Sequence, residues 1–121
     1  MRVVDVNEVT RSIKEMCIEA NYFLPRDMKN ALRKASNIEK APLGRHILKQ
    51  LQENMNIAEE EMIPLCQDTG MAVIFMEIGQ DVHFAEGVLE CAIQEGVRQG
   101  YEQGYLRKSV VRDPVLRENT K

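Results

Sequence analysis

The sequence predicts a helix-rich α+β fold, with three N-terminal helices, a short β segment after the Cys-Gln-Asp-Thr-Gly loop at 66–70, and then a long helix. Three observations predict this fold. Apolar residues recur at helical spacing through the first half of the chain. Prolines mark the starts of the second and third of these stretches. An apolar run then follows the loop, as is typical of a buried strand.

The first three helices are placed by their caps and their apolar faces. Asn7 is a suitable N-cap residue for a helix that runs to about Ala20. Cys17 falls on the apolar face of this helix, so we expect it to belong to the core. Pro25 suits the first turn of a second helix, and Pro42 begins a third, since proline is favoured at helix starts.

The pattern changes after the loop. Residues 71–78 are almost all apolar and lie between Gly70 and Gly79, which predicts a mostly buried strand. A second short strand is expected at 81–84, and a long helix at about 88–101. The segment from Arg107 to Asn119 is interpreted as extended and basic, with a break at Asp113-Pro114.

Length and charge limit the classes of function. At 121 residues the chain suits one domain, and its net charge is −3. Residues 50–97 carry ten acids and no Lys or Arg, whereas residues 98–121 carry six basic residues and three acids. This balance gives no support to nucleic-acid binding, which needs a clustered basic face. No apolar stretch is long enough to span a membrane and no signal peptide is evident, so we expect a cytoplasmic location without a membrane partner.

The three cysteines, Cys17, Cys66 and Cys91, are far apart in the sequence. An odd number at wide spacing argues against a disulfide framework and against a metal site built from a pair of close cysteines. If one of them binds a metal, the other ligands must come from elsewhere. A thiol redox enzyme using Cys66 is a weaker alternative, because no resolving cysteine lies nearby.

The loop at 66–70 places a thiol, an amide, a carboxylate and a hydroxyl on consecutive residues. Such a density of ligands and proton carriers suggests an active site. Asp68, Thr69 and Gly70 are also ordinary turn residues, and Cys66 alone is commonly a small buried apolar residue. Chemistry alone therefore favours a simple turn, and the loop gains weight only from the residues around it.

Four stretches, in order, resemble the alpha subunit (N-terminal part) of the iron–sulfur-dependent fumarate/tartrate hydro-lyases, the class I fumarases. They are Cys17–Pro25, Ile63–Phe75, Glu95–Tyr101 and Gly104–Pro114. Alpha subunits of that family are considerably longer than this chain. The resemblance therefore implies that residues 1–121 are an N-terminal segment of the hydro-lyase alpha-subunit domain, and we expect a truncated one.

The resemblance also implies a site. The family holds a 4Fe–4S cluster with three cysteines, and Cys66 corresponds to one of these ligands. Asp68 corresponds to the catalytic carboxyl, which contacts the substrate hydroxyl and acts as a general acid. Gln67 corresponds to an amide that contacts a substrate carboxylate. Arg107 corresponds to the guanidinium that grips a carboxylate with its planar fork of donors.

The implied activity is the addition or removal of water on a small dicarboxylate, either fumarate/L-malate or tartrate/oxaloacetate. The implied partners are a beta subunit or C-terminal domain of the same enzyme, and a homo-oligomer is expected. Since one ligand cannot hold the cluster, we expect the isolated chain to lack the cluster and to be inactive. The alternative hypothesis is a non-catalytic structural or assembly segment.

Overall fold

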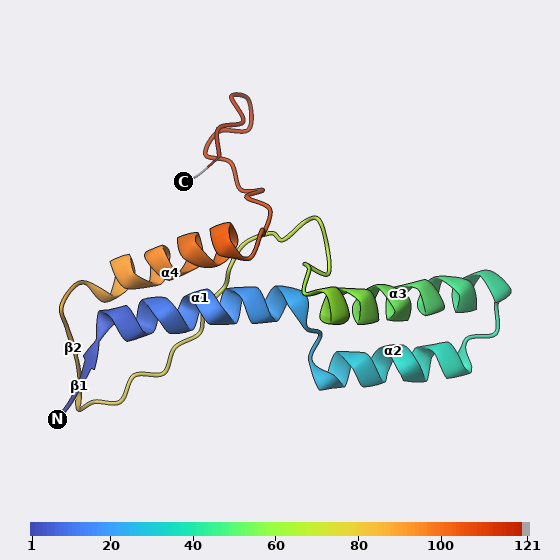
Figure 1. The fold of residues 1–121 in the computed structure, drawn as a ribbon, viewed down its shortest axis with the longest axis horizontal. Helices are drawn as coiled ribbons and strands as arrows, with labels where there is room; N and C mark the ends of the chain where they lie inside the picture. Colours follow the sequence, from blue (N-terminus) through green and yellow to red (C-terminus); the bar gives the residue numbers. More distant parts are fainter. Residues whose placement is uncertain (120–121) are drawn as a thin grey trace. The chain divides into compact units, whose positions relative to one another are not determined.

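The computed structural model describes residues 1–119, and it confirms the helix-rich α+β class (Figure 1). The described chain forms two compact units. The split unit comprises Met1–Ile18 together with the chain from Gln67 onward, and the hairpin unit comprises Glu19–Cys66. The elements in chain order are β1 (Arg2–Asp5), α1 (Val6–Tyr22), α2 (Arg26–Ile38), α3 (Pro42–Glu61), β2 (Val82–Ala85) and α4 (Leu89–Gln103).

In the hairpin unit, α2 and α3 pack against each other as two neighbouring helices (Figure 1). Pro25 is the N-cap residue of α2 and Pro42 is the first residue of α3, which confirms the predicted starts of both helices. The Lys29 ammonium lies 2.6 Å from the Glu59 carboxylate and ties the two helices together. Helix α3 ends at Glu61, and the next residue, Met62, caps it in the left-handed conformation at φ 54°.

The split unit contains two β–α pairs. Strands β1 and β2 are parallel, with Arg2 opposite Val82, and each strand leads into a helix, α1 or α4. The expected strand at 81–84 is confirmed as β2, whereas β1 was not predicted. The predicted cap at Asn7 is wrong, because α1 begins at Val6 and the Asp5 carboxylate accepts a hydrogen bond of 2.8 Å from the Asn7 backbone N–H. A carboxylate in this position satisfies a backbone donor that the helix leaves unpaired.

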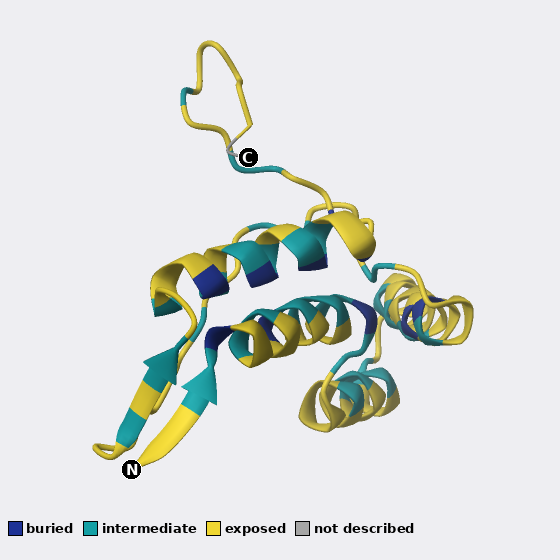
Figure 2. Cartoon of the chain, turned by 60° about the vertical axis from the view of Figure 1, so that its left-hand side comes forward, coloured by how far each residue is buried: buried dark blue, intermediate teal, exposed yellow. Residues whose placement is uncertain are grey.

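Helices α1 and α4 approach each other closely through glycines. A Cβ built on Gly96 would lie 2.7 Å from both the Ile13 Cβ and the Thr10 carbonyl oxygen. One built on Gly100 would lie 2.7 Å from the Cys17 Cβ. The buried positions of α4 accordingly face α1 in Figure 2. Cys17 therefore packs in this interface as predicted, and burial raises the pKa of its thiol.

The predicted strand at Met71–Ile78 is wrong for the described chain. These residues form no strand, and most of them are exposed: Val73 retains 71% and Phe75 94% of its accessible surface. No backbone hydrogen bond joins this run to another segment among residues 1–119. A strand is completed by hydrogen bonds from a neighbour, so an apolar pattern alone cannot produce one.

The segment after α4 is largely irregular, in agreement with the extended segment expected there. Its break falls at the predicted place, where the Asp113 carboxylate accepts hydrogen bonds from the backbone N–H groups of Val115 and Leu116. These bonds hold the pKa of Asp113 below its ordinary value. A single antiparallel bridge between Val111 and Asn119 closes the turn. Among the described helices, none combines the length and the apolar character needed to cross a membrane.

Candidate active-site loop

Side chains of the loop at 67–70 are hydrogen-bonded to the segment that follows α4. The Ser109 hydroxyl donates to the Asp68 carboxylate over 3.0 Å, and the Arg107 backbone N–H donates to the Thr69 hydroxyl over 3.1 Å. The Ser109 hydroxyl also lies 3.4 Å from the Arg107 carbonyl oxygen, so its single proton favours the nearer acceptor, the Asp68 side chain. The structure thus brings the segments of two predicted site residues, Asp68 and Arg107, together from positions far apart in the sequence.

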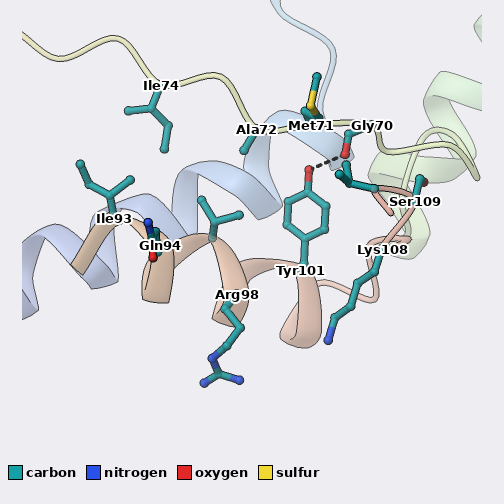
Figure 3. A pocket seen from close by; sticks show the side chains of 12 residues that line it. Gly70, Met71, Ala72, Ile74, Ile93, Gln94, Arg98, Tyr101, Lys108 and Ser109 are labelled. Carbon is teal, nitrogen blue, oxygen red and sulfur yellow. Dashed lines mark hydrogen bonds between the residues drawn. The ribbon is translucent and has the colours of Figure 1, made fainter. Parts of the chain in front are cut away.

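The end of the loop is held by α4. The Tyr101 hydroxyl donates a 3.1 Å hydrogen bond to the Gly70 carbonyl oxygen, as Figure 3 shows. Burial, and secondly the nearby Cys17, raise the pKa of Tyr101, so its phenol keeps the proton that it donates. Gly70 has a φ of 70°, a conformation that costs an L-residue with a side chain about 1–2 kcal/mol. Gly70 therefore allows the backbone to turn at the position where the Tyr101 hydroxyl donates its hydrogen bond.

An open groove of about 410 Å³ adjoins this loop in the split unit. Its lining is largely apolar and comes from residues 70–72 and 74, from α4 and from the segment 108–110 (Figure 3). Gly70 and Ser109 line the groove, whereas Gln67, Asp68 and Arg107 do not. These last three side chains are exposed to solvent. The predicted substrate contacts therefore lie beside the groove and open to solvent.

Arg98 lines the groove and forms ion pairs with two acidic residues of its own helix, α4. Its guanidinium lies 2.7 Å from the Glu95 carboxylate and 2.8 Å from that of Glu102. The hydrogen bond from Arg98 is the main reason that the pKa of Glu95 falls to about 2. Because Arg98 already faces two carboxylates, it is less suited than Arg107 to gripping a substrate anion.

Cys66 is the last residue of the hairpin unit, is exposed, and forms no disulfide. An accessible thiol suits one ligand position of an iron–sulfur cluster, because soft sulfur is the preferred ligand of such clusters. Within residues 1–119, no group of three His, Cys, Asp or Glu side chains is placed to hold a metal ion. The chemistry of Cys66 therefore fits one ligand position of such a cluster.

Two residues that contact the loop, Tyr101 and Ser109, were not predicted from the sequence. Both lie in stretches that carry the family resemblance, Glu95–Tyr101 and Gly104–Pro114. Their place in these stretches is the sequence feature that could have identified them as candidate site residues. Their partners are 31 and 41 positions away, so no local pattern reveals the contacts.

Comparison with known proteins agrees with the resemblance. The profile of the family described as fumarate hydratase (Fumerase) matches residues 10–121. A Methanocaldococcus jannaschii protein named "Putative L(+)-tartrate dehydratase subunit alpha" is 40% identical over 123 residues, covering 100% of this chain and 40% of that protein. The L(+)-tartrate dehydratase subunit alpha of Escherichia coli strain K12 is 24% identical over 106 residues, covering 88% of this chain and 35% of that protein.

The chain thus spans less than half the length of these two relatives. The family match, in contrast, extends over nearly all of its residues and includes both hydrogen-bonded segments of the loop. The chain belongs to the fumarate hydratase (Fumerase) family.

Proposed function

We propose that this chain is part of a 4Fe–4S-dependent hydro-lyase that adds or removes water on a small dicarboxylate, fumarate/L-malate or tartrate/oxaloacetate. The observation that carries the proposal is the pair of hydrogen bonds from the segment 107–109 to the loop at 68–69. They hold a carboxyl group and an arginine-bearing segment side by side. A hydro-lyase acting on a dicarboxylate needs both, because a hydroxyl must leave and an anion must be held.

Each proposed residue has a chemical task. In the dehydration direction, Asp68 contacts the substrate hydroxyl and, as a general acid, gives it a proton so that the C–O bond breaks and water departs. The proton on the neighbouring carbon is removed by a base that we assign to the polypeptide outside this chain. Ser109 donates to one carboxylate oxygen of Asp68 and so fixes the orientation of this group. Gln67 donates its amide N–H to a substrate carboxylate. Arg107 grips a carboxylate through two parallel hydrogen bonds, for which guanidinium is well shaped.

Cys66 is proposed as one of three cysteine ligands of the cluster, the other two being supplied by polypeptide outside this chain. When bound, such a cluster supplies an open iron position that polarises the substrate hydroxyl as a Lewis acid. Support comes from the exposure of Cys66 and from its place directly before Gln67. Cys17 is less suitable because it packs against Gly100, and Cys91, which is also exposed, does not adjoin Gln67 and Asp68 in the sequence.

The partners follow from the names of the relatives. Two of them are alpha subunits, so we propose that this chain acts as the N-terminal segment of an alpha subunit together with a beta subunit or a C-terminal domain. We further propose a homo-oligomeric enzyme in the cytoplasm.

The proposal is tested with this chain assembled with the remaining alpha-subunit polypeptide and a beta subunit, reconstituted without oxygen. We expect hydration of fumarate or dehydration of tartrate. Asp68→Asn should lower kcat about 10²–10⁴-fold, the usual contribution of a general acid. Arg107→Lys should mainly raise KM. Cys66→Ser should abolish the cluster's visible absorption.

Matched controls come from the same chain. Cys91→Ser alters an exposed cysteine on α4, and Arg112→Lys alters an exposed arginine of the same C-terminal segment. Both variants should leave absorption and turnover unchanged. Full cluster content and full activity in Cys66→Ser would refute the role of Cys66. Wild-type turnover in Asp68→Asn would refute the general acid.

A non-catalytic structural or assembly role is the second candidate for the chain on its own. Its basis is the number of proposed ligands, because Cys66 alone cannot hold a cluster that needs three cysteines. Iron and sulfide added anaerobically to the isolated chain should give no stable cluster and no hydro-lyase activity. A stoichiometric cluster on the isolated chain would contradict this role.

A further inference from the structure

The segment Met71–Ile78 has the composition of a buried strand but the surroundings of a surface loop. Seven of its eight residues are apolar, and Glu77 is the exception. Val73 and Phe75 keep 71% and 94% of their accessible surface. Its backbone forms no hydrogen bond with another segment in the described part of the chain. An extended apolar segment with unused donors and acceptors is a template for pairing with another strand.

One face of the segment already has a place to pack. Ala72 and Ile74 line the groove together with Ile93 and Val97 of α4. Figure 3 shows the side chains of Ala72 and Ile74 on the side of the segment that faces α4. Successive side chains of an extended chain point to opposite faces. Val73 and Phe75 therefore fall on the opposite face, which agrees with their exposure. A strand that is apolar on both faces is typical of a sheet that is covered on both of its faces.

We infer that Met71–Ile78 is a docking strand, which pairs with a β-strand from the part of the hydro-lyase alpha subunit that this chain does not contain. The choice of this occupant rests on the proposed function. It is supported by length, because more than half of the Methanocaldococcus jannaschii relative lies outside the matched stretch. That region provides ample chain for an additional strand.

Charge favours the same occupant over a second copy of this chain. Residues 67–97, which belong to the split unit, contain six acids and no Lys or Arg, and Glu77 lies within the docking strand itself. Pairing two copies of this segment would bring two acid-only stretches together, and like charges facing each other oppose association. The partner strand should therefore be apolar on both faces and neutral or basic near Glu77.

The test uses this chain, tagged, alone or co-expressed with a polypeptide equivalent to the unmatched part of the Methanocaldococcus jannaschii relative. We measure co-purification and backbone amide hydrogen exchange by mass spectrometry. Residues 71–78 should exchange at least 100-fold more slowly in the complex than in the chain alone. Phe75→Lys should reduce the recovered complex at least tenfold. Val115→Lys, a matched control at another exposed apolar residue of the split unit, should not reduce it.

Four results would overturn the inference. They are no complex with the folded chain, a complex in which residues 71–78 still exchange rapidly, equal effects of Phe75→Lys and Val115→Lys, and protection of 71–78 that grows with the concentration of the chain alone. The last result would assign the surface to a second copy. None of these measurements depends on turnover, so a docked but inactive complex would refute the proposed function while leaving the docking strand intact.

Discussion

Replacing Gly96 by alanine should destabilise the split unit, although alanine is the better helix former. The exchange gains about 1 kcal/mol of helix propensity. The new methyl group, however, would lie 2.7 Å from the Ile13 Cβ and 2.7 Å from the Thr10 carbonyl oxygen. Overpacking of this kind costs about 1–3 kcal/mol, and neither neighbour is a flexible side-chain end. With the cost near its upper limit, we expect a net loss of about 1–2 kcal/mol.

Gly44→Ala is the matched control, since Gly44 is also a helical glycine with a nominal clash. Its Cβ would meet atoms of the Glu39 side chain at 2.8–3.2 Å, and this side chain can move away. Amide hydrogen exchange followed by NMR reports on α4 for the first variant and on α3 for the second. Exchange in α4 should accelerate about 5–30-fold in Gly96→Ala, since this is the ratio that 1–2 kcal/mol represents. An α4 of unchanged or greater stability in Gly96→Ala would refute the close helix contact.

Three further outcomes are expected. Tyr101→Phe removes the hydrogen bond to the Gly70 carbonyl and should lower the free energy of unfolding by about 0.5–1.5 kcal/mol, as measured by chemical denaturation. An unchanged denaturation midpoint would show that the bond contributes nothing to stability. Gly70→Ala should lower the free energy of unfolding by about 1–2 kcal/mol, because residue 70 has a φ of 70°. Gly79→Ala should leave this free energy nearly unchanged, and equal losses in the two variants would contradict the strain argument. The pKa of Glu95 is lowered from 4.5 to about 2, so the hydrogen bonds that its carboxylate accepts stabilise α4 fully at pH values above about 4.5. This contribution is lost as the pH falls from about 4.5 to 2. A carbon NMR titration of Glu95 should show a midpoint near 2 that returns toward 4.5 in Arg98→Gln.

The helices could be predicted from the sequence because their signals are local. Pro25 and Pro42 mark helix starts through properties of proline itself, and the structure places α2 and α3 accordingly. The strands depended on distant partners. Strand β1 has only four residues and pairs with β2, which lies far along the chain. The sequence near Arg2 therefore contains no pattern that predicts this strand. Conversely, residues 71–78 have the pattern of a strand but no pairing neighbour in the described chain.

The candidate site was predictable to the extent that its residues occur in family-like stretches. Asp68 and Arg107 were identified in this way, and the structure places their segments side by side. The hydrogen bonds that do so were not predictable, because they depend on how the chain returns after α4. The hydroxyls of Thr69 and Ser109 form the link, and serine and threonine are common in loops that have no such task.

The parallel pairing of β1 with β2 has a consequence for synthesis on the ribosome. The hydrogen-bond partners of Arg2–Asp5 lie about 80 positions later in the chain. At typical elongation rates of about 5–20 residues per second, strand β1 waits for several seconds before its partner strand has been made. Helices α2 and α3 emerge within that interval and depend only on each other for their ion pair. Residues 2–5 therefore leave the tunnel well before their final neighbours have been made.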